Sequence, residues 1–157
     1  MIELRILSES EIAPYFEDLW RTYRAELISA GFTEGYAEEN IENTKKSVFS
    51  GGALNSGNYI FYAFAGKDRV GKLWLTCTES KVNKGKKEWS IYDIETFPEY
   101  QKKGFGRQIM LAAEEYVKSL GGDSISLSVF GNNLPAQKLY ESLNYETVRL
   151  MMKKRLN

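Results

Sequence analysis

Residues 98–107 read Pro-Glu-Tyr-Gln-Lys-Lys-Gly-Phe-Gly-Arg, and this stretch decides the fold. It follows a β-rich run, residues 89–97, and opens an amphipathic helical pattern over residues 107–120. A strand, a tight turn and a helix N-terminus in this order form an anion site, because several backbone N–H groups point the same way and the helix dipole adds partial positive charge. Gly104 and Gly106 lack a Cβ, so the main chain can turn sharply and come close to a phosphate. The stretch therefore predicts a phosphate-binding loop.

The spacing of this loop separates it from two common nucleotide-binding motifs. From Gln101 onward it reads Gln-x-x-Gly-x-Gly, which is neither Gly-x-Gly-x-x-Gly nor a loop that ends in Gly-Lys-Ser/Thr. A dinucleotide-binding protein or a P-loop protein is therefore not expected. The side chains of Lys102, Lys103 and Arg107 would either add positive charge to the phosphate site or remain solvated.

A second motif lies near the end of the chain, where residues 133–145 read Asn-Leu-Pro-Ala-Gln-Lys-Leu-Tyr-Glu-Ser-Leu-Asn-Tyr. The two stretches together resemble the pyrophosphate loop and the signature Asn-x-x-Ala-x-x-Leu-Tyr-Glu-x-x-Gly-Phe of the GNAT superfamily, the coenzyme-A-dependent N-acyltransferases. Asn144 replaces the glycine and tolerates its left-handed conformation, and Tyr145 keeps the aromatic ring. The resemblance runs over most of the chain. It implies an acetyl-CoA-dependent N-acetyltransferase in which a primary amine attacks directly in a ternary complex.

The resemblance also implies where acetyl-CoA binds. The loop amides would hold the pyrophosphate, and the extended strand Tyr92–Phe97 would hydrogen-bond the pantetheine arm, with a backbone N–H near Ile94–Thr96 polarising the thioester carbonyl. Asn133 would contact the pantetheine arm or, alternatively, cap the helix that follows it. The expected cofactor-binding residues are Ile94, Glu95, Thr96, Gln101, Lys102, Lys103, Gly104, Phe105, Gly106, Arg107, Asn133 and Tyr140.

Tyr140 is the expected general acid. In the GNAT superfamily the matching tyrosine donates a proton to the departing thiolate, whereas the alternative is an aromatic that only packs. A phenol has a pKa of about 10 and a thiol of about 8.5, so the proton transfer is uphill by roughly 2 kcal/mol. A hydrogen bond from Tyr140 that stabilises the thiolate would need less.

Asp93 and Glu95 lie within an expected interior strand, where carboxylates are costly unless they meet water, a partner or a ligand. They share parity with Trp89 and Ile91, so a regular strand would not place both on the opposite, solvated face. GNAT strands often carry a bulge here, which would break that parity. One interpretation is a general base or an anchor for a cationic amine, with Asp93 favoured. The other is a pair of carboxylates bound to neighbouring lysines or backbone.

Composition excludes several classes of protein. The chain has 157 residues, which suits a single domain over residues 1–157. Its formal net charge is zero, so nucleic acid is not an expected partner, and no apolar run approaches transmembrane length, so neither is a membrane. The absence of histidine excludes Ser-His-Asp catalysis and removes the commonest ligand of catalytic zinc, so no metal is expected. One cysteine, Cys77, and no recognisable signal peptide fit a cytoplasmic protein.

Apolar periodicity predicts the element order β-α-α-β-β-β-α-β-α-β. The expected strands are residues 2–6, 59–65, 70–78, 88–97, 124–130 and 145–154, and the expected helices are residues 9–30, 34–47, 107–120 and 134–143, the first two capped by Ser8 with Glu11 and by Thr33. This order predicts an α/β (α+β) fold with a mixed, mostly antiparallel twisted sheet of about 6–7 strands and helices on both faces. The resemblance implies that strands 88–97 and 124–130 splay apart at the cofactor.

The acceptor is the least specified part of the reaction. Acidic residues favour a small cationic amine such as a polyamine, an aminoglycoside or an amino-acid-like metabolite, and a protein N-terminus or lysine is the alternative. A catalytically inactive coenzyme-A-binding sensor is an alternative of another class. The acidic second helix and the aromatic side chains before and within it would line the acceptor pocket or form a solvated face over a core; the aromatics are Tyr15, Trp20, Tyr23, Phe32 and Tyr36. We expect a monomer or a homodimer.

Overall fold

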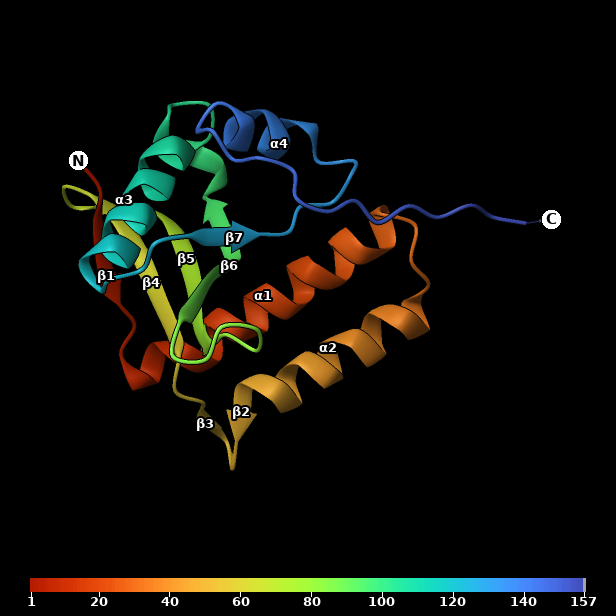
Figure 1. Ribbon diagram of the computed structural model, residues 1–157. Helices are drawn as coiled ribbons and strands as arrows, with labels where there is room; N and C mark the ends of the chain where they lie inside the picture. Colours follow the sequence, from red (N-terminus) through yellow and green to blue (C-terminus); the bar gives the residue numbers. More distant parts are fainter. Residues whose placement is uncertain (157) are drawn as a thin grey trace.

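A five-stranded sheet with the strand order β1-β4-β5-β6-β7 forms the centre of the fold (Figure 1). The computed structural model describes residues 1–156. Its strands are β1 (Glu3–Ile6), β2 (Phe49–Ser50), β3 (Ala53–Leu54), β4 (Asn58–Ala65), β5 (Asp68–Glu79), β6 (Lys87–Thr96) and β7 (Ile125–Leu127). Its helices are α1 (Glu9–Ser29), α2 (Glu34–Val48), α3 (Phe105–Ser119) and α4 (Leu134–Glu141), with a 3-10 turn at Pro98–Tyr100. Neighbouring strands are antiparallel except β6 and β7, so the predicted mixed, mostly antiparallel sheet is confirmed.

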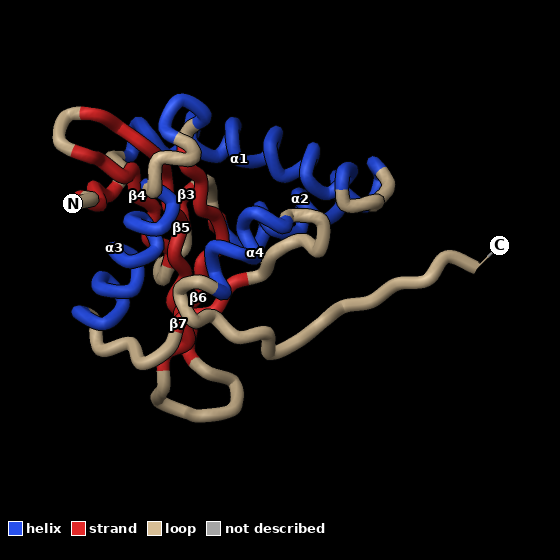
Figure 2. Tube along the Cα trace, turned by 90° about the horizontal axis from the view of Figure 1, so that it is seen from above, coloured by secondary structure: helices blue, strands red, loops and turns tan. Residues whose placement is uncertain are grey.

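Helices cover both faces of the sheet, as predicted (Figures 1 and 2). Side chains alternate between the two faces along a strand. In β5, Leu73 and Leu75 pack with Ile109 of α3, whereas Trp74 packs with Phe16 of α1 on the other face. Two apolar cores therefore lie on the two sides of β5. A charged side chain of the sheet that is buried under the helices needs a partner inside the protein.

The predicted helix starts are confirmed by their caps. The Glu11 carboxylate accepts the backbone N–H of Ser8 at 2.9 Å, and the Thr33 hydroxyl oxygen accepts the backbone N–H of Tyr36 at 3.3 Å. At the start of α3, Gly104 has φ = +83°, a left-handed conformation that a side chain would oppose. The glycine turn therefore directs the chain from the sheet into α3.

A β-bulge at Tyr92 decides which side chains of β6 face α1. In the ladder between β5 and β6, Trp74 pairs with Asp93 but Leu75 pairs with Ile91, so Tyr92 is the extra residue. A bulge of this kind interrupts the regular alternation of side chains. Ile91 packs in the core beneath α3, whereas Asp93 contacts α1. The bulge that the GNAT resemblance implied is present, and it places Asp93 opposite Trp74 on the α1 face.

β6 and β7 separate just beyond this bulge. Their parallel ladder begins with Trp89 opposite Ile125 and ends with Ile91 opposite Leu127. From residue 92 to 96, β6 keeps β5 as its only strand partner within residues 1–156. The splayed strands implied by the resemblance are therefore present, and the backbone of residues 92–96 has one edge without a strand.

Three predictions about strands were wrong. The main sheet has five strands rather than six or seven, and β2 and β3 form a separate two-stranded ribbon. The strand expected over residues 124–130 is confined to 125–127. The strand expected over residues 145–154 is absent, and the chain after α4 runs outward from the body in both views (Figures 1 and 2). A strand exists only where a second strand pairs with it, and alternation within 145–154 carries no information about a partner.

Candidate active site

The glycine loop presents unpaired backbone donors at the start of α3. The N–H groups of residues 102–107 make no backbone hydrogen bond within the described chain, and the first amide bond back into the turn comes from Gln108 to the Gly104 carbonyl at 3.3 Å. Lys102, at φ = +60°, and Gly104, at φ = +83°, turn the chain through the left-handed region. Converging free amides at a helix N-terminus bind an anion, so the loop fits the pyrophosphate of a coenzyme A group.

Gly106 brings three elements together beside this loop. A Cβ built on it would lie 3.4 Å from Leu139 Cδ2 of α4 and 3.4 Å from Thr96 Oγ1 at the end of β6. Gln101 reinforces this junction, because its side-chain amide donates to the Thr96 carbonyl at 3.1 Å. The loop, the open edge of β6 and the helix that carries Tyr140 therefore meet at one place.

Two of the three cations predicted at the loop are engaged with the protein itself. Arg107 donates to the carbonyl and the hydroxyl of Ser142, at 3.3 and 2.6 Å, and so ties α3 to the end of α4. The Lys103 ammonium donates to the Glu99 carbonyl at 2.8 Å. These contacts make Arg107 part of the scaffold that fixes α4, and they leave the backbone amides as the main anion donors of the loop.

Asp93 lies half-buried between β6 and α1. Its Oδ2 accepts the Tyr15 hydroxyl at 2.7 Å. Burial raises the pKa of the Asp93 carboxyl above its ordinary value, and the nearby Lys72 ammonium and the Tyr15 hydrogen bond counteract part of that rise. Tyr15 is 2% exposed, and burial and the Asp93 charge raise the pKa of its hydroxyl well above 10, so it acts as a donor. A carboxylate with a raised pKa is a better proton acceptor than a solvated one.

Lys72 is a functional candidate that the sequence analysis missed. It lies opposite Glu95 in the ladder of β5 and β6 and is 2% exposed. Its ammonium is 2.9 Å from Glu95 Oε2 and 2.8 Å from Asp18 Oδ2 of α1. The alternative stated for the carboxylate pair, binding to a neighbouring lysine, therefore describes Glu95. The sequence contained the signal for Lys72, because a lysine inside an apolar strand, like Asp93, is costly unless it meets water, a partner or a ligand.

Tyr140 is partly buried in α4, with its ring centroid 6.0 Å from that of Tyr145. Burial raises the pKa of the Tyr140 hydroxyl, and the carboxylates of Asp93 and Glu26 raise it further. Glu26 of α1, which the sequence analysis also missed, has a raised pKa because of partial burial and the Asp93 and Glu95 charges. The structure thus brings Tyr140, Asp93 and Glu26 within electrostatic reach of one another, and Tyr140 keeps its proton at neutral pH.

Asn133 caps α4, since its side-chain oxygen accepts the Ala136 backbone N–H at 3.3 Å. The capping interpretation therefore holds for this residue, and a contact with the pantetheine arm remains a prediction. At the other end of α4, Asn144 has φ = +66°, the left-handed conformation expected for the position of the family's glycine. The motif 133–145 thus defines both ends of the helix that carries Tyr140.

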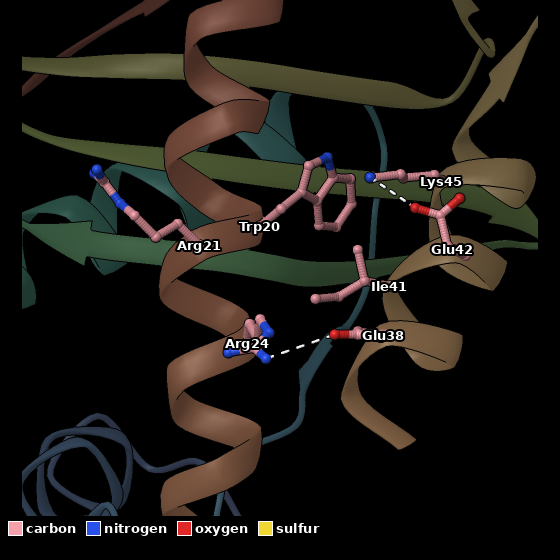
Figure 3. A pocket seen from close by; sticks show the side chains of 7 residues that line it. All are labelled: Trp20, Arg21, Arg24, Glu38, Ile41, Glu42 and Lys45. Atoms are coloured by element: carbon pink, nitrogen blue, oxygen red, sulfur yellow. Dashed lines mark hydrogen bonds and ion pairs between the residues drawn. The ribbon is translucent and has the colours of Figure 1, made fainter. Parts of the chain in front are cut away.

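The acidic face of α2 has cationic partners on α1 and within α2. Figure 3 shows a hollow between these helices, lined by Trp20, Arg21, Arg24, Glu38, Ile41, Glu42 and Lys45. Arg24 lies 3.6 Å from Glu38, and Lys45 lies 2.8 Å from Glu42. The carboxylates near Asp93 come from α1 and β6 and not from α2. Both interpretations of the acidic α2 face, as a lining of the acceptor pocket and as a solvated surface, stay predictions.

Two features are absent from residues 1–156. No group of His, Cys, Asp and Glu side chains there could hold a metal ion. None of the helices in that range has the length and apolar character needed to cross a bilayer.

Comparison with known proteins identifies the family. The model of the acetyltransferase (GNAT) family matches residues 12–145, so the chain belongs to this family of acetyl-CoA-dependent N-acetyltransferases. The uncharacterised N-acetyltransferase YycN of Bacillus subtilis is 27% identical over 99% of this chain and 99% of its own. Its crystal structure superposes with a TM-score of 0.88 at 25% identity, covering 100% of this chain and 99% of its own. An acetyl transferase from Pyrococcus furiosus, 28% identical, superposes with a TM-score of 0.67, covering 98% and 100% of the two chains.

Proposed function

We propose that this N-acetyltransferase acetylates a primary amine of a small cationic metabolite, such as a polyamine, an aminoglycoside or an amino-acid-like compound. The observation that carries the proposal is the charge of the site. Four carboxylates, from Asp18, Glu26, Asp93 and Glu95, share two cations: the buried Lys72 ammonium, which pairs with Asp18 and Glu95, and the exposed Arg21, which pairs with Asp18. An acceptor ammonium would supply the missing positive charge. A fold neighbour, an aminoglycoside acetyltransferase in complex with sisomicin, is 18% identical and shows the fold alone.

Asp93 is the proposed general base. An alkyl ammonium with a pKa of about 10.4 loses its proton at pH 7 at a cost of roughly 4.6 kcal/mol, and the neutral amine is the nucleophile. The Tyr15 hydrogen bond occupies Asp93 Oδ2, and Oδ1 has no hydrogen-bond donor within residues 1–156. Asp93 Oδ1 can therefore accept the amine proton, whereas Glu95 is held by Lys72.

Tyr140 is the proposed general acid. In the overall reaction the amine nitrogen forms a bond to the acetyl carbon, the carbon–sulfur bond breaks, and the sulfur takes a proton. The Tyr140 hydroxyl, kept protonated by burial and by nearby carboxylates, holds that proton. The acetyl thioester supplies the activated acyl group. The amides of residues 102–107 and the open edge of β6 over residues 92–96 would hold its coenzyme A portion.

The first experiment is calorimetric titration with acetyl-CoA, with NADH and ATP as controls. We expect micromolar binding of acetyl-CoA and none of either control. A panel of polyamines and aminoglycosides is then compared with a peptide panel for acetyl transfer. Acetylation of peptides alone would overturn the proposed acceptor class, and binding without transfer to any amine would indicate a sensor rather than an enzyme.

The role of Asp93 is tested with Asp93→Asn, which keeps the shape and an acceptor oxygen for Tyr15. We expect kcat/KM at pH 7 to fall by roughly 10²- to 10⁴-fold, the usual contribution of a general base. The dissociation constant for acetyl-CoA should not change. Glu88→Gln, an exposed substitution at the other end of β6, is the matched control and should leave kcat/KM unchanged. An unchanged rate for Asp93→Asn would remove Asp93 from the mechanism.

A further inference from the structure

We propose that Lys72 is a positioning residue for Asp93: its buried ammonium holds the carboxylates of Asp18 and Glu95 and keeps Asp93 ionised beside them. The consequence for catalysis rests on the proposed function. The effect of Lys72 on the charge of Asp93 does not rest on the proposed function, because it follows from the arrangement of the side chains alone.

The geometry separates the three carboxylates by partner. The Lys72 ammonium lies 2.8 Å from Asp18 Oδ2 and 2.9 Å from Glu95 Oε2, and 5.3 Å from the centre of the Tyr15 ring. Asp93 is bound instead by the Tyr15 hydroxyl, at 2.7 Å. Lys72 therefore fixes α1 and β6 through Asp18 and Glu95, and Asp93 remains free of a direct ion pair within the described chain.

Lys72 is the one buried cation among the charged groups around Asp93 in the described residues; Arg21, which pairs with Asp18, has a side chain that is 80% exposed. Those groups are Tyr15, Asp18 and Glu26 of α1, Lys72 of β5, Glu95 of β6 and Tyr140 of α4. An opposite charge favours the ionised form of a carboxyl group, and like charges favour the protonated form. Without the ammonium, Asp93 would face three carboxylates, which favour its protonated form. A protonated Asp93 cannot accept the proton of the amine.

The buried position of Lys72 has a physical explanation. Burial alone would lower the pKa of its ammonium, but the charge of Asp93 and the contacts with Asp18 and Glu95 outweigh burial, so the pKa is raised. The ammonium therefore stays charged across the pH range in which Asp93 titrates. It acts as a fixed positive charge beneath the site and does not exchange protons with the acceptor.

The decisive measurement is the titration of the Asp93 carboxyl carbon by ¹³C NMR, assigned with Asp93→Asn. In Lys72→Met, which keeps the length of the chain without the charge, we expect the protonation constant of Asp93 to rise at least tenfold. Lys72→Arg, which restores a cation, should return it most of the way to the wild-type value. An unchanged titration in Lys72→Met would overturn the proposal whether or not the enzyme acetylates an amine.

Asp18→Asn keeps the experiment decisive if Lys72→Met does not fold. Asp18 is 44% exposed, and its removal deletes one negative charge while Lys72 keeps Glu95. The protonation constant of Asp93 should then fall, opposite in sign to the effect of Lys72→Met. Because unfolding would expose Asp93 and also lower the constant, the titration uses Asp18→Asn whose circular dichroism spectrum matches that of the wild type. An equal or higher constant would contradict the proposal.

Activity measurements separate this proposal from the proposed function. In the acetyltransferase assay the acidic limb of the pH profile of kcat/KM should move up in Lys72→Met and down in Asp18→Asn, with acetyl-CoA binding unchanged by calorimetry. If no amine is acetylated but the NMR titrations shift as expected, the proposed function fails and the role of Lys72 stands. If the wild type acetylates amines and neither titration shifts, the role of Lys72 fails and the proposed function stands.

Discussion

Replacing Gly71 by alanine tests the close approach of β5 to the strand that carries the site. Gly71 lies opposite Thr96, and a Cβ built on it would overlap the Glu95 carbonyl oxygen and lie 2.7 Å from Ile109 Cδ1. The Ile109 side chain can rotate away, but the Glu95 carbonyl belongs to the backbone of β6. The two strands must therefore move apart by about 1 Å to reach an ordinary van der Waals separation, which strains the sheet beside Asp93.

Overpacking of this kind costs about 1–3 kcal/mol of unfolding free energy. For a chain of this length each kcal/mol corresponds to roughly 2–4 °C in melting temperature, so Gly71→Ala should melt about 2–12 °C below the wild type. A displacement of about 1 Å at a catalytic group can lower the rate by about 10²-fold, so kcat/KM should fall as well.

Circular dichroism melts and initial-rate assays measure both effects. Gly35→Ala is the matched control, because Gly35 lies in α2 with nothing within 4 Å of a built Cβ. Alanine favours a helix over glycine by about 0.5–1 kcal/mol, so the control should melt at or above the wild-type temperature. If Gly71→Ala melts at the wild-type temperature, the reasoning about the approach of β5 to β6 is refuted.

Three further predictions concern single side chains. Tyr140→Phe should lower kcat by about 10²- to 10⁴-fold in steady-state assays and leave acetyl-CoA binding unchanged, whereas Tyr145→Phe, its neighbour, should keep most of the activity. Glu26→Gln should raise KM for a cationic acceptor by roughly tenfold, because it removes one negative charge from the site, and an equal effect on a neutral amine would contradict this. The pKa of Glu11 is lowered to about 2 by hydrogen bonds from Arg5 and Ser8, so its contribution to stability is present above about pH 4.5 and is lost as pH falls toward 2. In urea unfolding, Glu11→Gln should therefore be less stable than the wild type at pH 7, and the difference should shrink by pH 3.

Helix boundaries were predictable because capping is local. One helix start is predicted by Ser8 with Glu11 and another by Thr33, in each case from no more than four residues of sequence. Both helices begin where these caps place them. The conformation of Asn144 was predictable for the same reason, since a single residue that tolerates positive φ ends α4. Each of these features depends on neighbours in the chain and not on the rest of the fold.

Strand pairing was less predictable because it depends on a distant segment. The alternation in residues 145–154 is typical of a strand, yet Val148 is 92% and Met152 is 90% exposed, and nothing within residues 1–156 pairs with them. β7 ends at Leu127, which lies opposite Ile91, the last residue of β6 before the bulge at Tyr92. Neither outcome is visible in the local pattern of either segment.

Some residues of the candidate site were predictable from the sequence, and Lys72 was not. The motif pointed to the loop and to Tyr140, and an interior strand with two carboxylates pointed to Asp93 and Glu95. Lys72 was missed because its partner is set by the register of β5 against β6, which the extra residue at the bulge shifts. A charged residue inside an apolar strand shows that a partner exists, but only the fold shows which one.

In the proposed reaction the negative charge of the site would help binding of the ammonium and hinder its deprotonation, and this conflict predicts a pH profile. Carboxylates that bind an ammonium also stabilise its protonated form, so the roughly 4.6 kcal/mol needed for deprotonation at pH 7 becomes larger in the site. Each unit by which the Asp93 pKa exceeds its ordinary value returns about 1.4 kcal/mol to that proton transfer. Burial of Asp93 raises its pKa in this direction, and the charge of Lys72 limits the rise.

The same reasoning applies to the acid at the other side of the reaction. The pKa of Tyr140 is raised above 10 by burial and by the Asp93 and Glu26 charges, so Tyr140 keeps its proton while the acceptor amine loses its own. The rate kcat/KM for a primary alkyl amine should therefore rise steadily from about pH 6 to about pH 9, without the fall that an acid of ordinary or lowered pKa would produce. A bell-shaped profile with a maximum near pH 7 would mean that a different group donates the proton to the leaving thiolate.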